Sequence, residues 1–207
     1  MFQTIINALK DKDIRKKILL TLMFVAIYRL CCFIPVPGLD PDNFTVNEFF
    51  GLLSSITGGA LANGTLFAMG IVPYINASII MQLLAVAIPY LQRLSERGEE
   101  GRKKLANITR WATIILAVIQ AVGIVLSWRS EGAIIPINIT STVQLPEWLT
   151  IIFIVMIFTA GTTFAMWIGE RITDYGVGNG ISLLIFVGII STAANALYTA
   201  IVNSFKD

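Results

Sequence analysis

The chain has 207 residues, of which 56% are hydrophobic and only 14% are charged, and its formal net charge is +2. Soluble globular domains carry about 25% charged residues, so this composition excludes an ordinary soluble domain and predicts an integral membrane protein. The sequence contains no histidine, and its two cysteines, Cys31 and Cys32, are adjacent. This set of residues is not typical of a zinc or other transition-metal centre, so we expect neither a metal nor a cofactor.

Five apolar segments are long enough to cross a membrane, which takes about 20 residues of helix. In chain order they cover residues 18–34, 66–90, 111–128, 148–168 and 180–202. The first segment ends at a Pro-Val-Pro-Gly sequence, which cannot continue a helix. The third begins and ends with tryptophan, a residue that favours the membrane interface. The sequence therefore predicts an all-α membrane protein with five transmembrane helices.

Basic residues are concentrated on one side of these predicted spans. Segment 1–17 contains five, segment 91–110 contains six and Arg171 follows the fourth span, which makes 12 of the chain's 15. The positive-inside rule places this side in the cytoplasm, with the N-terminus inside and the C-terminus outside. We expect segment 1–17 to be a cytosolic amphipathic tail and segment 91–110 a cytosolic basic loop. The first residues do not resemble a cleavable signal peptide, so we expect the first span to be retained.

The second predicted span is unusually polar for a membrane helix. It contains Gly70, Pro73, Asn76, Ser78 and Gln82 within an otherwise apolar stretch. Polar groups at membrane depth cost free energy unless they face protein or a water-filled cavity. The pattern therefore indicates a helix that lines something rather than a passive anchor.

Segment 39–65 lies outside the membrane in this topology, yet it is rich in phenylalanine and leucine. Thr45 or Asn47 is a suitable cap for a short helix over residues 48–56, and the Gly-Gly pair at 58–59 is suited to end it. Such a helix is too short to span the membrane and too apolar for a solvated loop. It is either a re-entrant, pore-occluding helix or a helix lying flat at the interface.

Several short motifs occur along the chain in a characteristic order. They are YR at 28–29 with FIPVPG at 33–38, FF at 49–50 with GGAL at 58–61, the stretch 67–84, GEEGRKK at 98–104, TAGT at 159–162, MWIGE at 166–170 and GVGNGIS at 176–182. Together they resemble the SecY family of bacterial protein-conducting channels over nearly the whole chain. That family has ten spans in two inverted halves, and such repeats place the functional site at their interface. The resemblance implies that this chain supplies the first half, as a fragment or as a separately made half.

The resemblance also implies a pore. Ile75 and Ile79 are spaced i, i+4 on one helix face, and Ile181 and Ile185 share that spacing. A ring of such apolar side chains excludes water and ions when the channel is empty. Spacing alone favours ordinary core packing, but the resemblance assigns these four isoleucines to the pore ring.

Three further groups of residues follow from the same resemblance. The expected plug comprises segment 39–65, with Phe49, Phe50, Leu53, Gly58 and Gly59. The expected lateral gate, where signal sequences leave into lipid, includes Asn76, Ser78 and Gln82. We expect Asn76 and Gln82 to hydrogen-bond across helices. The expected docking surface for the SecA ATPase or the ribosome includes Arg93, Arg102, Lys103, Lys104 and Arg171.

The implied protein is a non-enzymatic channel in the bacterial cytoplasmic membrane. Its expected partners are spans 6–10 of the other half, SecE, SecG, SecA, the ribosome, signal sequences, nascent polypeptide and membrane lipid. One alternative is the repeat half of a secondary transporter with a solute site at Asn76, Ser78 and Gln82. That function usually requires a buried carboxylate or lysine, and predicted spans two, three and five contain no acidic residue. Another is a membrane scaffold without a pathway, which the polar second span disfavours.

Overall fold

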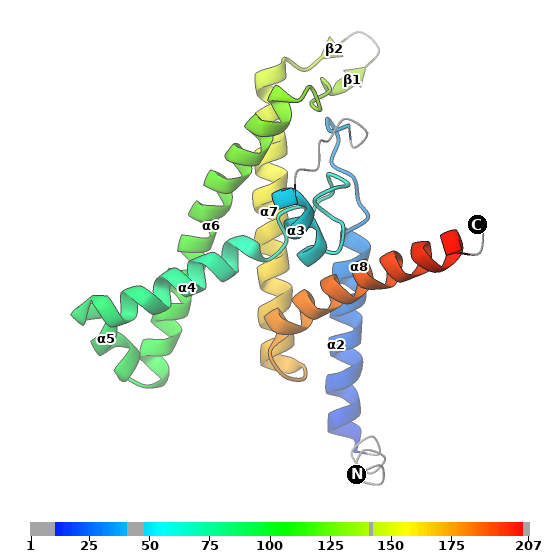
Figure 1. Ribbon diagram of the computed structural model, residues 1–207. Coiled ribbons are helices and arrows are strands. Elements are labelled where there is room, and N and C mark those ends of the chain that lie inside the picture. Colours follow the sequence, from blue (N-terminus) through cyan, green and yellow to red (C-terminus); the bar gives the residue numbers. More distant parts are fainter. Residues whose placement is uncertain (1–10, 41–47, 141–142, 205–207) are drawn as a thin grey trace.

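The computed structural model describes residues 11–40, 48–140 and 143–204 (Figure 1). The helices within these ranges are α2 (Lys12–Cys31), α3 (Glu48–Ile56), α4 (Val72–Ala87), α5 (Pro89–Glu96), α6 (Glu99–Ser130), α7 (Glu147–Tyr175) and α8 (Gly180–Ser204). Two short strands, β1 (Asn138–Thr140) and β2 (Val143–Gln144), pair antiparallel with Asn138 opposite Gln144. The predicted amphipathic tail lies mostly outside the described residues, as do Thr45 and Asn47, the candidate caps.

Three of the helices are long and apolar enough to cross a membrane, namely α6, α7 and α8. The pair α4 and α5 meets the same test only when the two are taken together, and they are bent by 101° at their junction. Helix α2 carries Arg15, Lys16 and Lys17 near one end and Arg29 near the other, so its uncharged stretch is short. The predicted helical membrane protein is confirmed, whereas the count of five spans stays a prediction.

The second predicted span, residues 66–90, is wrong as a single continuous helix. Residues before Val72 form turns, and the helix that follows ends at Ala87. Ile88 has extended backbone angles of φ −104° and ψ 115°, because the ring of Pro89 disfavours the helical conformation of the residue before it. Pro89 also lacks the N–H that would continue the helix, so the chain changes direction and begins α5.

Segment 91–110, predicted as a loop, is instead a helical hairpin made of α5 and the first turns of α6. The turn between the two helices is tight, and Gly98 lies there with φ +72°. Leu91 and Leu94 of α5 pack with Met81 of α4 in a small apolar cluster. Its apolar leucines and helix-favouring residues explain why this basic segment folds instead of remaining a solvated loop.

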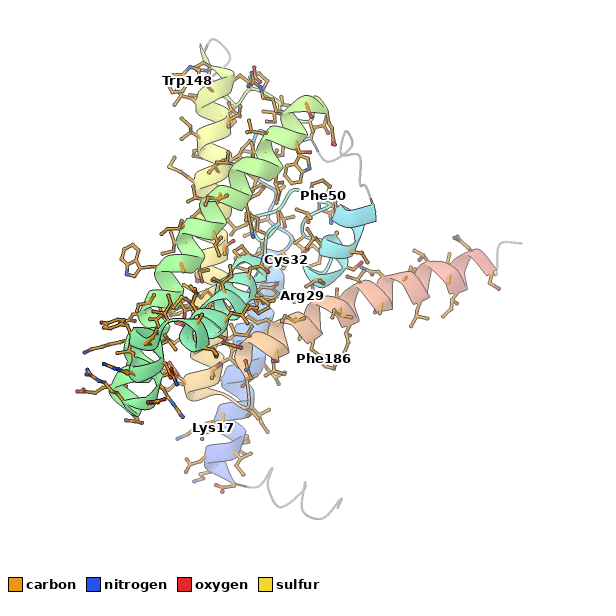
Figure 2. The ribbon with its side chains drawn as sticks, turned by 60° about the vertical axis from the view of Figure 1, so that its left-hand side comes forward. Lys17, Arg29, Cys32, Phe50, Trp148 and Phe186 are labelled. Carbon is orange, nitrogen blue, oxygen red and sulfur yellow. The ribbon has the colours of Figure 1, made fainter. Side chains whose placement is uncertain are left out.

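The two ends of the molecule carry different kinds of side chain (Figure 2). Lys17 lies at one end, near the start of α2, and Trp148 lies at the opposite end, near the start of α7. At the Trp148 end the connecting segments are tied together by backbone hydrogen bonds. Val36 N donates to Gly64 O over 3.0 Å, Leu66 N donates to Ile34 O over 2.9 Å, and Asp40 N donates to Ala133 O over 3.0 Å. These bonds fix the segments on either side of α3.

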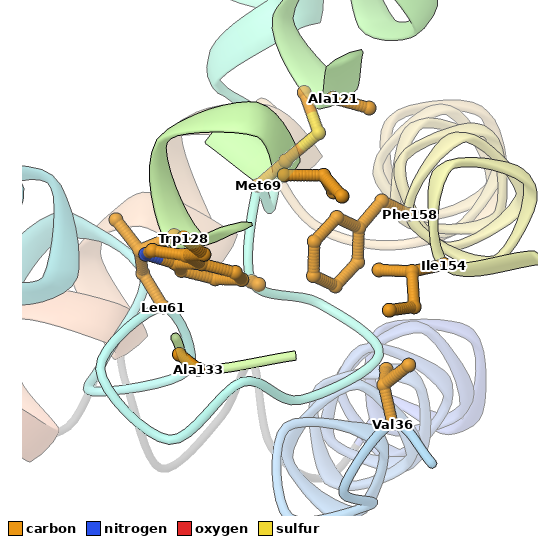
Figure 3. Packing of buried hydrophobic residues seen from close by; sticks show 10 residues of the cluster. Val36, Leu61, Met69, Ala121, Trp128, Ala133, Ile154 and Phe158 are labelled. Atoms are coloured by element: carbon orange, nitrogen blue, oxygen red, sulfur yellow. The ribbon is translucent and has the colours of Figure 1, made fainter. Parts of the chain in front are cut away.

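The main core lies where α6 and α7 pack against these connecting segments (Figure 3). Trp128 of α6 meets Phe158 of α7 edge to face, with ring centroids 5.8 Å apart. One face of α6 carries small buried residues at four-residue intervals, including Thr113, Ala117 and Ala121. Small side chains let membrane helices approach closely, so this stripe positions α6 against its neighbours.

Candidate functional site

The short helix α3 lies amid the other helices and begins and ends where the sequence predicts. Gly58 and Gly59 follow it with φ +70° and +88°, a conformation that only glycine adopts without strain. Phe50 and Leu53 pack against the main core, while Ser54 and Thr57 are buried. The side chain of Phe49 lies outside the described residues. Helix α3 is therefore held by protein on at least one face.

All four predicted pore isoleucines line one cavity of about 500 Å³. Ile75 and Ile79 come from α4, and Ile181 and Ile185 come from α8, so residues a hundred positions apart in the chain share a surface. Ile79 is 50% exposed, and the other three are partly exposed. Their helical neighbours Ala77 and Leu184 are completely buried instead. Ile75 and Ile181 also pack against the core cluster that contains Leu184, so these two side chains both border the cavity and contact the core.

One rim of the isoleucine cavity is polar. Arg110 Nε of α6 lies 2.7 Å from Glu170 Oε1 of α7, and both residues line the cavity. Arg110 Nη1 also donates to Asn107 Oδ1 over 3.1 Å, which orients the guanidinium. Asp174 lines the same rim. Sequence reasoning missed this ion pair, although opposite charges at the ends of neighbouring predicted spans were a usable signal.

The predicted lateral-gate residues do not lie together. Ser78 and Gln82 line the isoleucine cavity, whereas Asn76 lines a second cavity of about 480 Å³ between α3, α4 and α6. Residues two positions apart on a helix point in nearly opposite directions, which explains the separation. Gln82 Nε2 donates to Ser78 Oγ over 3.3 Å within α4, so the predicted cross-helix bond of Gln82 is wrong.

The second cavity is mainly apolar and includes part of α3. Phe50 and Leu53 lie on one side, and Gln120 of α6 contributes a second amide beside Asn76. Sequence reasoning did not single out Gln120, because one glutamine within a long apolar helix carries no pattern. Side chains of α3, α4 and α6 therefore line the same cavity.

The predicted docking residues fall on different helices. Arg93 lies on α5 and Arg102, Lys103 and Lys104 lie in the first turns of α6, where all four are exposed. Arg171 lies on α7, with its guanidinium carbon 5.5 Å from the ring centroids of both Trp167 and Tyr175. Aromatic faces attract cations, so these two rings orient the Arg171 side chain. Within the described ranges, no such aromatic contact is found for Arg93, Arg102, Lys103 or Lys104.

These features define a multi-pass helical membrane protein in which four isoleucines from two non-adjacent helices line one cavity with a polar rim. The SecY family model matches residues 65–206, and the chain belongs to this family. It is 44% identical over 204 residues to the protein translocase subunit SecY of Staphylococcus carnosus, covering 95% of this chain and 46% of that protein. Its identity to the same subunit of Bacillus licheniformis is 42% over 211 residues, covering 100% and 48%. The chain thus spans about half the length of the curated relatives that it matches.

Solved structures share the fold. "The structure of a protein conducting channel" matches with a TM-score of 0.62 at 23% identity, covering 86% of this chain and 37% of that one. Sec61 in the canine ribosome–channel complex matches with the same TM-score, identity and coverage. The predicted family and helical fold class are therefore confirmed.

Proposed function

We propose that this chain forms half of the wall of a protein-conducting channel that exports unfolded polypeptides and releases membrane segments into lipid. The observation that carries the proposal is that Ile75, Ile79, Ile181 and Ile185 line one cavity although they come from two different helices. The relatives that cover the chain are named protein translocase subunits, which supports the same activity.

An apolar constriction suits a channel that must pass side chains of every kind. Isoleucine has no hydrogen-bonding group and is stiff at χ1, so it offers a passing chain no specific partner. The same side chains dewet the empty pore and so exclude ions. The other half of the ring would come from the complementary half of the channel. No chemical step is needed, and the proposed protein is not an enzyme.

Helix α3 is the proposed plug of this channel. Phe50 and Leu53 already face the space between α3, α4 and α6, and the turn at Gly58 and Gly59 provides a flexible connection behind them. Movement of α3 would open the pathway, and its return would seal it. Ser78 and Gln82 on α4 would line the lateral exit for signal sequences, and Asn76, which lines the second cavity, would border this exit on the side of α3.

The proposed setting is the bacterial cytoplasmic membrane, with the Lys17 end in the cytoplasm. The other half of the channel, SecE and SecG are the proposed partner subunits. The exposed residues Arg93, Arg102, Lys103 and Lys104, together with Arg171, are proposed to contact the SecA ATPase or the ribosome. Basic side chains suit a partner with acidic or phosphate groups. The energy for transport would come from such a partner.

A crosslinking experiment tests this function. The chain is co-expressed with the complementary half of a SecY relative, and a photo-crosslinker is placed at Ile75, Ile79, Ile181 or Ile185 while a secretory chain is stalled in transit. Ile115 and Phe153 are matched controls, because they are 59% and 40% exposed on α6 and α7 and do not line the isoleucine cavity. We expect crosslinks at the four isoleucines alone. Export without crosslinks there would contradict the proposed pore.

The transporter alternative gains no support from the structure. Helices α4 and α8, which provide the isoleucines, contain no acidic residue for ion coupling, and Glu170 of α7 at the rim of the cavity is paired with Arg110. The three predicted solute-site residues also divide between two cavities.

A further inference from the structure

Arg29 is a cation near the end of α2 whose side chain turns toward the protein. Its Nη2 donates hydrogen bonds to the backbone oxygens of Val187 and Gly188 in α8, the latter over 3.5 Å. Charged residues within membrane segments are costly and usually face protein or a water-filled cavity, where they find partners. The neighbouring Leu30 is 69% exposed, so the two residues point in different directions.

The guanidinium of Arg29 also lies against the turn that follows α3. A Cβ atom added at Gly58 would overlap Arg29 Nη1, so the guanidinium lies directly against this turn, where Gly58 has a φ of +70°. Nη1 itself is buried and has no hydrogen-bond partner within the described ranges. The cation therefore lies beside the C-terminal end of α3, which is the partially negative end of the helix dipole.

Helix α8 also contacts the same end of α3. Gly188 lets the Ile56 carbonyl approach so closely that a Cβ atom at position 188 would overlap it. Thr192 Oγ1 donates to Ser55 O over 3.1 Å, so the side chain of α8 bonds a terminal carbonyl of α3. Figure 2 shows Arg29 where α2 and α8 meet.

We propose that Arg29 is a latch that holds α3 in the closed position by joining the ends of α2 and α3 to α8. This inference rests on the proposed function, since it assigns a positioning residue to the proposed plug. When α3 moves away, the guanidinium loses the negative end of that helix and faces the pathway with only its α8 contacts. Return of α3 restores the pairing, so Arg29 favours reclosure.

Disulfide formation between α3 and α8 measures this docking directly. The chain is co-expressed with the complementary half, with Cys31→Ala and Cys32→Ala removing the native thiols and Ser55→Cys with Thr192→Cys adding a reporter pair. We expect Arg29→Ala to slow formation of the reporter disulfide about ten-fold, because the substitution removes the cation that faces the partially negative end of α3. The same substitution in the chain with native Ser55 and Thr192 should make resting membranes leak ions. Arg29→Lys should give intermediate values, because charge is kept and the fork of donors is lost.

Leu30→Ala is the matched control and should change neither readout. Unchanged disulfide formation and unchanged leak in Arg29→Ala, at a normal level of inserted protein, would overturn the latch. If Arg29→Ala fails to insert, Arg29→Gln decides by the same two readouts. Crosslinking at Ile75 in the same membranes separates the two proposals. Crosslinks without any effect of Arg29 would reject the latch alone, whereas absent crosslinks would reject the channel itself.

Discussion

Gly161 and Gly123 show what a single glycine does in two helices of this protein. A Cβ atom at Gly161 of α7 would overlap the carbonyl of Leu66, whereas at Gly123 of α6 it would meet nothing within 4 Å. Gly161 therefore lets α7 pack on the backbone that leads into α4. The sequence contains both glycines without distinguishing them, because only the partner across the contact makes one necessary.

We predict that Gly161→Ala destabilises the protein and Gly123→Ala does not. Overpacking costs about 1–3 kcal/mol, while alanine in an open helical position gains about 0.5–1 kcal/mol over glycine. The measurement is the free energy of unfolding in detergent, with both variants compared with the parent. Equal effects of the two substitutions would contradict the close packing of α7 on Leu66.

At the scale of elements, local sequence signals predicted some helix boundaries correctly and missed others. The helix at Glu48–Ile56 and the glycine turn that follows it at Gly58 were predicted because a glycine turn is a local property of the sequence. The break at Ile88 was missed, although Pro89 was visible in the sequence. A proline within an apolar run either kinks or ends a helix, and packing of α5 against α4 and α6 decides which.

We predict that Pro89→Ala straightens the junction between α4 and α5. The change restores a backbone N–H at position 89 and frees Ile88 to adopt helical angles. Distances between spin labels at Ile80 and Gln92 should then increase. Pro73→Ala is the control, because proline in the first turn of a helix removes no hydrogen bond. An unchanged label distance in Pro89→Ala would mean that packing alone holds the bend of 101°.

At the scale of the whole molecule, large apolar surfaces remain uncovered. Helix α8 extends away from the others toward the C-terminus, and Leu197 and Ile201 are 65% and 56% exposed (Figure 1). On α4, Leu83 is 66% exposed. Lipid covers some of such a surface, and in the proposed channel the complementary half would cover the rest. The pore is accordingly a property of the assembled protein.

We predict that the paired substitution Ile79→Ala with Ile185→Ala makes the assembled channel leak ions at rest. Shorter side chains widen the apolar constriction, which weakens its exclusion of water. The measurement is ion flux across vesicles that contain the chain with its complementary half. Ile115→Ala is the control, because Ile115 is 59% exposed on α6 outside the cavity. An equal leak from the control would remove the two isoleucines from the constriction.

By itself, the sequence determined the membrane class, three of the long helices, the short helix α3 and the family. These depend on composition, on runs of apolar residues and on local turn chemistry, all of which are properties of residues close together in the sequence. Only the tertiary structure decided that Asn76 lines a different cavity from Ser78 and Gln82. It also decided that Arg110 pairs with Glu170, and that Arg29 contacts α8 and Gly58. These contacts join distant residues, and their geometry depends on how whole helices pack.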